Sequence, residues 1–200
     1  MNTRTRALLA ALPLITALGL AGCAGTAPGA GDMPGMDHGS GGHTASAAVA
    51  TPADVMFVTM MIPHHQQAVE MADLVLAKDD VDPRVVGLAE RIQAAQGPEI
   101  ERMQGWLADW GIDPARTDTS MDHGDGMMTA EDMTALEDAD GPTAGLLFLE
   151  QMVVHHEGAV DMARAALDDA ADADVRALAQ QVIDDQTAEI AEMQQLAGSL

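Results

Sequence analysis

Apolar residues recur at every third or fourth position along most of the chain beyond residue 50, which is the spacing of one face of an α-helix. Four long stretches and one short stretch carry this pattern. Residues typical of helix ends separate them: Thr51 and Asp82 each precede a proline at the start of a stretch, and Gly111 follows the end of another. Pro63 predicts a kink within the first stretch. We therefore expect long helices over about 51–78, 82–110, 143–170 and 173–198, and a short helix over about 129–141.

The first and third long stretches are related in sequence, and so are the second and fourth. His64-His65 within MMIPHHQQAVEMADLVL returns 91 residues later as His155-His156 within QMVVHHEGAVDMARAAL. A Gln-x-x-Glu-Ile-x-x-Met sequence occurs at 96–103 and again at 186–193, an offset of 90. Each helical hairpin has one apolar stripe that it cannot bury alone. The duplication therefore predicts an all-α fold, a four-helix bundle with a pseudo-twofold axis.

The net charge indicates which binding partners the protein favours, and the composition indicates how its core is built. The 200 residues hold 32 Asp and Glu but only 9 Lys and Arg, for a formal net charge of −23. Such a charge disfavours nucleic acid or an anionic membrane surface as a partner, and it attracts cations. With two Phe, two Trp and no Tyr, the core must be built from aliphatic residues and methionine, which agrees with an all-helical domain.

The N-terminal segment is predicted to direct export. Residues 1–22 combine an arginine-containing start with an apolar run and end in Leu-Ala-Gly before Cys23, which resembles the lipobox of bacterial lipoproteins. A transmembrane helix is the disfavoured alternative, because the run is short and contains Pro13. We expect Cys23 to be lipidated and to anchor the protein on the outer side of the cytoplasmic membrane. Residues 23–50 are rich in Gly, Ala and Ser and are predicted to form a flexible tether to a bundle domain over 51–200.

Imidazoles and thioethers share the apolar faces of the first and third long helices. Each His pair has a Met three residues before its first His and another seven after it. At 100° per residue these side chains fall within an arc of roughly 120°. On the second and fourth long helices, the stripe carries a Glu and a Gln among aliphatic residues. A carboxylate there costs several kcal/mol unless it is paired, and the available partners are the imidazoles of the facing helix.

A repeated set of His and Met favours a soft metal. Thioethers select Cu(I), and imidazole accepts Cu(I) or Cu(II), whereas zinc without thiolates would need His and carboxylates only. The Glu-x-x-His pattern of di-iron bundles is absent. We therefore predict copper, held in each half of the bundle by ligands from His64, His65, Met61, Met71, His155, His156, Met152 and Met162. The residues predicted to orient these ligands or to complete the site are Gln96, Glu99, Met103, Gln186, Glu189 and Met193.

Two further features bear on metal binding. The tetrad Met-Asp-His-Gly occurs at 36–39 and again at 121–124, each time in a Gly-rich stretch. These stretches either capture metal or carry His and Met that have no metal role. The auxiliary capture residues would be Met33, Met36, His38, His43, Met121, His123, Met127 and Met128. For the bundle itself, the competing interpretation is a buried His–Glu network that sets helix register while the Met residues fill the core.

The chain resembles an exported bacterial family known as domain of unknown function 305. The resemblance rests on Met-Ile-Pro-His-His at 61–65 and Ala-Val-Glu-Met-Ala at 68–72, on the related sequence at 148–163, and on the repeated Gln, Glu-Ile and Met positions. It covers about residues 51–197. It implies a ferritin-like four-helix bundle and, from some members, a periplasmic copper-binding role in copper tolerance.

We therefore predict an exported lipoprotein that binds copper for sequestration, tolerance or transfer, with a copper-transfer protein as its partner. No nucleophile with an oriented base is apparent, so we expect a binding protein and no enzyme. Two alternatives stay open at this point. One is a redox metalloenzyme of the bundle type, and the other is a structural or interaction module without metal.

Overall fold

The structure is a computed structural model that describes residues 50–113 and 126–200. Within these ranges the chain forms five helices and no strand, which confirms the all-α prediction. Each predicted helix is present, with ends shifted by no more than about three residues. The first stays continuous through Pro63. The helices are α1 (Pro52–Leu76), α2 (Pro83–Asp109), α3 (Ala130–Asp138), α4 (Gly141–Asp169) and α5 (Ala173–Ala197).

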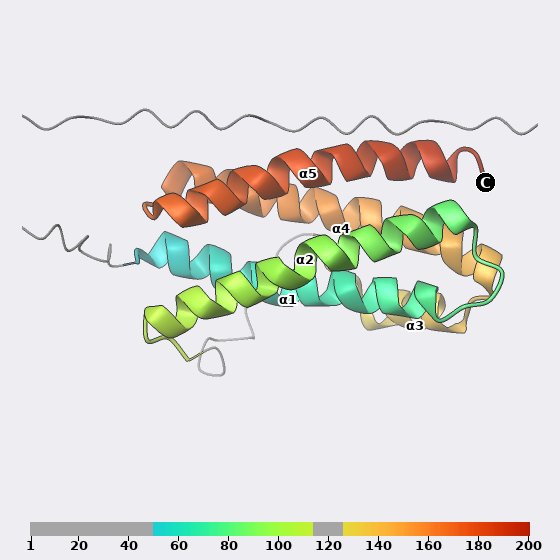
Figure 1. The fold of residues 1–200 in the computed structure, drawn as a ribbon, viewed down its shortest axis with the longest axis horizontal. Coiled ribbons are helices and arrows are strands. Elements are labelled where there is room, and N and C mark those ends of the chain that lie inside the picture. The colour runs from blue at the N-terminus through green and yellow to red at the C-terminus, as the bar shows by residue number, and fades with distance from the viewer. Residues whose placement is uncertain (1–49, 114–125) are drawn as a thin grey trace, which may run out of the picture. The chain divides into compact units, whose positions relative to one another are not determined.

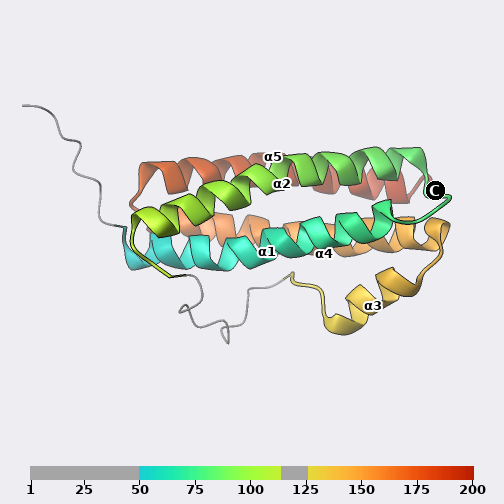
Figure 2. The ribbon, with the colours of Figure 1, turned by 60° about the horizontal axis from the view of Figure 1, so that its bottom comes forward.

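The four long helices form two hairpins, α1 with α2 and α4 with α5, that pack together through α1 and α4 (Figure 1). The short helix α3 lies outside this bundle, against α1 and α4 (Figure 2). No helix in the described parts of the chain is both long and apolar enough to cross a membrane.

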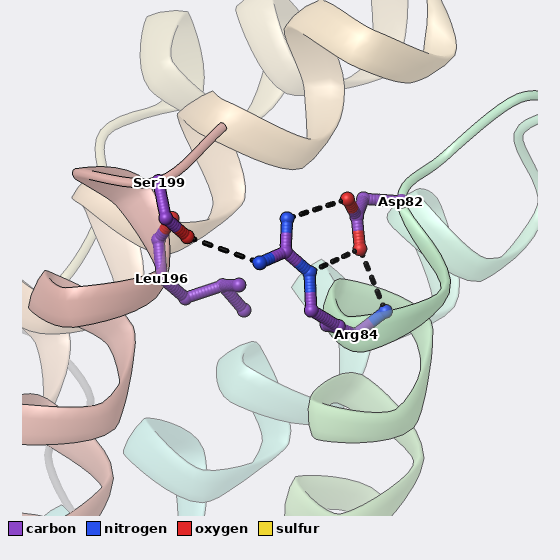
Figure 3. Close-up of polar contacts among 4 residues, drawn as sticks. All are labelled: Asp82, Arg84, Leu196 and Ser199. Carbon is purple, nitrogen blue, oxygen red and sulfur yellow. Dashed lines mark hydrogen bonds and ion pairs between the residues drawn. The ribbon is translucent and has the colours of Figure 1, made fainter.

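Side chains at the helix ends tie the hairpins to each other. At one end, Arg84 on α2 binds the Asp82 carboxylate and donates to Ser199 Oγ at 3.1 Å (Figure 3). At the other end, the buried Asp54 carboxylate accepts bonds from the backbone N–H groups of Ala171 and Asp172, both at 3.0 Å. The start of α1 is thereby attached to the turn between α4 and α5.

Two apolar clusters fill the interior, one toward each end of the bundle. Between them every long helix contributes polar residues: on α1, for example, Ile62 belongs to one cluster and Ala68 to the other, with the first His pair between them. Among the described residues, a polar layer thus separates the two apolar clusters. We call it the histidine layer; its members are His64, His65, Gln96, Glu99, His155, His156, Gln186 and Glu189.

Several predictions fall outside the described residues. They concern the signal peptide over 1–22, the tether over 23–50 apart from its last residue, lipidation of Cys23, and the capture residues Met33, Met36, His38, His43, Met121 and His123.

Candidate metal centre

All four histidines of the repeated pairs are buried. The exposed fractions of His64, His65 and His156 are 0%, and that of His155 is 1%. The helical periodicity explains this placement, because consecutive residues at the centre of an apolar stripe both face the core. Burial of four imidazoles in one layer is costly unless their nitrogens find partners.

The second histidine of each pair contacts a carboxylate on the neighbouring helix of its own hairpin. His65 Nε2 lies 2.8 Å from Glu99 Oε2, and His156 Nε2 lies 2.7 Å from Glu189 Oε2. Glu99 also accepts a bond from Gln181 Nε2 at 2.9 Å through its other oxygen. The two halves therefore repeat the same His–Glu pair, as the stripes predict. When Nε2–H donates to the carboxylate, the lone pair lies on Nδ1, which in both residues is buried and has no hydrogen-bond partner.

The first histidines of the two pairs meet each other. The ring centroids of His64 and His155 lie 3.7 Å apart, and the ring planes are inclined by 40°. This arrangement differs from the expectation of one separate site in each half, because α1 and α4 bring equivalent positions of the two hairpins together. The ring nitrogens of His64 have no hydrogen-bond partner among the described residues, and those of His155 approach only the backbone of His64, without the geometry of a full hydrogen bond.

Both of these imidazoles are held in their neutral form. Burial, followed by the neighbouring His65 and His156, lowers the pKa of His64 to about 3. Burial, followed by the contact with His64, also lowers the pKa of His155 well below its ordinary value. A neutral imidazole keeps a lone pair available to a metal, so these residues need not lose a proton on binding near neutral pH.

The unpartnered nitrogens fit a soft monovalent cation. Buried polar atoms in proteins nearly always have a partner, yet the histidine layer holds several that have none, including both side-chain polar atoms of Gln96. Among the described residues, no three His, Asp or Glu side chains form a group that could hold a metal ion. A cation bound by imidazoles alone or with thioethers matches the ligand preference of Cu(I) and differs from the four-ligand site that zinc prefers.

The predicted methionine ligands are divided between the two sides of the histidine layer. Met61 and Met103 belong to one apolar cluster, and Met71, Met152 and Met193 belong to the other, all with an exposed fraction of 0%. They flank the imidazoles from both sides of the layer. Met162 differs from its counterpart Met71, because it is half-buried and lines a surface pocket.

Comparison with known proteins identifies the family of this chain. Residues 54–197 match the model of a family described as domain of unknown function (DUF305). The chain belongs to the DUF305 family. No protein with a curated description matches it.

Solved structures of similar proteins share the fold. A DUF305 protein of Streptomyces coelicolor, described as secreted, is 34% identical, with a TM-score of 0.68 over 72% of this chain and 91% of that one. A DUF305 fragment from Deinococcus radiodurans is 33% identical, with a TM-score of 0.67 over 76% and 99%. CopM in its Cu(I)-bound form is 32% identical, with a TM-score of 0.63 over 73% and 96%. CopM has also been solved with Cu(II) and with silver bound.

Two predicted capture residues of this DUF305 chain are described, and neither lies in the histidine layer. The backbone of Met128 is bonded twice to the side chain of Gln67, at 2.7 and 2.9 Å, and its side chain packs against an apolar cluster. Met127 is half-buried. Sequence reasoning missed Gln181, which holds Glu99, because Gln181 belongs to the other hairpin and no repeated spacing marks it.

Proposed function

We propose that this protein is an exported copper-binding protein whose histidine layer holds Cu(I) for sequestration or transfer. The observation that carries the proposal is the contact between His64 and His155, two buried imidazoles with unpartnered nitrogens and ring centroids 3.7 Å apart. The copper-bound and silver-bound structures of CopM support it.

Each residue of the layer has a distinct role in this proposal. His64 and His155 are the central ligands, one from each hairpin. His65 and His156 offer Nδ1 to additional ions and not to the ion between His64 and His155, since no three of these side chains form one group that could hold a metal ion. Glu99 and Glu189 orient these two rings by accepting the Nε2 proton. Met61, Met71, Met103, Met152 and Met193 provide thioethers on either side, which suit a soft ion.

The cellular location is part of the same proposal. We infer that residues 1–22 direct export and that lipidated Cys23 keeps the bundle at the outer side of the membrane. The secreted description of the Streptomyces coelicolor relative supports export. Holding an ion among buried ligands serves binding and requires no chemical step, so we infer a non-catalytic role.

The test is an anaerobic Cu(I) titration of the full chain against a competing chelator. The double variant His64→Leu/His155→Leu should lose the tightest site, while His38→Ala/His43→Ala, which removes two imidazoles of the predicted tether, should keep it. Leucine removes buried polar atoms without opening a large cavity, so circular dichroism should show an intact fold. Wild-type affinity and stoichiometry in the folded His64→Leu/His155→Leu variant would exclude the proposed site.

A further inference from the structure

A pocket of about 160 Å³ opens on the surface between α1 and α4. Its walls come from the first turns of α1 and the last turns of α4. Three of its eight lining residues are methionines, whereas methionine makes up 15 of the 200 residues of the chain. The three are Met56, Met60 and Met162.

These methionines do not serve mainly to fill the core. Met56 is 54% exposed, the largest exposed fraction among the big apolar side chains in the described residues, and Met60 is half-buried. Neither packs with the apolar clusters that the described residues form, whereas Met162 packs at the edge of one. A flexible thioether left at the surface is free to bind a ligand.

The pocket and the central histidines lie on the same two helices, α1 and α4. Met56, Met60 and His64 follow one another at intervals of four residues, so they are neighbours along one side of α1. Exposure falls along this series from half-exposed through half-buried to fully buried. On α4, Met162 lies two turns beyond His155, the partner of His64.

The local charges favour a cation. Asp169, at the end of α4, lines the pocket. Arg176 donates to the carbonyl oxygens of Leu167 and Ala170 at the C-terminus of this helix, so the negative charge at the pocket comes from Asp169. The opposite partial charge at the N-terminus of α1 is compensated by the capping box of Thr51 and Asp54. Three thioethers beside a carboxylate form a donor set that suits a soft monovalent ion.

We propose that Met56, Met60 and Met162 form a second metal site, which binds Cu(I) or Ag(I) at the surface and passes it to the histidine layer. Binding at this site is independent of the function proposed above. When the ion moves from this site to the histidine layer, it exchanges thioether ligands for imidazole ligands. This step rests on the proposed function, because it requires that the histidine layer binds Cu(I).

The binding step is tested by nuclear magnetic resonance of the full chain labelled at the methionine methyl groups, titrated with silver nitrate in chloride-free buffer. The His64→Leu/His155→Leu variant is used so that the two central imidazoles of the layer do not compete for the ion. The methyl signals of Met56, Met60 and Met162 should shift together before that of Met133, a half-buried methionine on α3. Unchanged signals from these three methyl groups at saturating Ag(I) would overturn the site.

The transfer step is tested by the rate at which the histidine layer fills in Met56→Leu/Met60→Leu/Met162→Leu, compared with Met133→Leu. The triple variant should load more slowly but reach the same final occupancy of the layer. Equal loading rates would overturn transfer from this pocket. If the histidine layer of the wild-type protein binds no Cu(I) or Ag(I) but the three methionine signals still shift, the function proposed above is rejected and the second site is retained.

Discussion

His64 and His155 are 91 positions apart in the chain, yet their imidazole centroids lie 3.7 Å apart in the bundle core. Burial lowers the pKa of both imidazoles, and neighbouring histidines lower it further: His65 and His156 for His64, and first of all His64 for His155. The fold by itself therefore brings two neutral imidazoles, one from each hairpin, into contact.

Acid should weaken the metal-free fold before its carboxylates titrate. The unfolded chain protonates His64 and His155 near pH 6.5, whereas the folded chain does so only near pH 3 for His64 and well below 6.5 for His155. The free energy of unfolding should therefore fall with pH below 6.5, by about 1.4 kcal/mol per pH unit for each histidine. Urea denaturation at pH 6.5 and pH 5 measures the slope, and His64→Leu/His155→Leu should flatten it. Equal slopes in both proteins would contradict the lowered pKa values.

Loss of the Glu99 charge should weaken copper binding more than loss of the Glu189 charge. The side chain of Glu99 is 8% exposed and also bonded by Gln181, while that of Glu189 is 20% exposed. Because such carboxylates orient a metal-binding imidazole, Glu99→Gln should lower Cu(I) affinity by roughly 10- to 100-fold. Chelator competition provides the measurement, and Glu101→Gln on the exposed face of α2 is the matched control. If Glu99→Gln binds as tightly as Glu101→Gln does, the carboxylate has no orienting role.

Asp54 should matter more for stability than its counterpart Asp132. Both complete a capping box, but Asp54 is buried and also accepts bonds from the backbone of Ala171 and Asp172. Asp54→Asn should lower the free energy of unfolding by about 2–4 kcal/mol, since it weakens several buried bonds at once, whereas Asp132→Asn should cost about 1 kcal/mol or less. Chemical denaturation of both variants decides this, and equal costs would mean that the link between the hairpins contributes nothing.

Two glycine substitutions should have opposite effects. A Cβ atom at Gly141 would lie 1.7 Å from the backbone oxygen of Asp79, so Gly141→Ala should destabilise the fold by roughly 1–3 kcal/mol or more. A Cβ at Gly105, within α2, would meet no atom within 4 Å, so Gly105→Ala should stabilise by about 0.5–1 kcal/mol. Thermal denaturation measures both. A stable Gly141→Ala variant would show that the start of α4 can move away from the turn between α1 and α2.

The local periodicity of the sequence determined the helices of this protein and their pairing into hairpins. The spacing of apolar residues and the helix-end residues predict five helices, and the duplicated motif predicts two hairpins in one bundle. The same periodicity predicts that the His pair of each hairpin faces a Glu on the neighbouring helix, because the two apolar stripes of a hairpin pack together; the structure shows that His65 makes this contact with Glu99. These features depend on interactions between residues close in sequence, or on a motif that occurs twice in the sequence.

Only the tertiary structure decided how the two hairpins meet. The contact of His64 with His155 depends on the axial position and rotation of α1 against α4, which no short loop constrains. The same packing leaves Met162 in a surface pocket beside Met56, although its spacing from His155 matches that of the buried Met71 from His64. Periodicity specifies which face of a helix is apolar. Side-chain packing between the helices decides which part of that face is buried and which part stays at the surface.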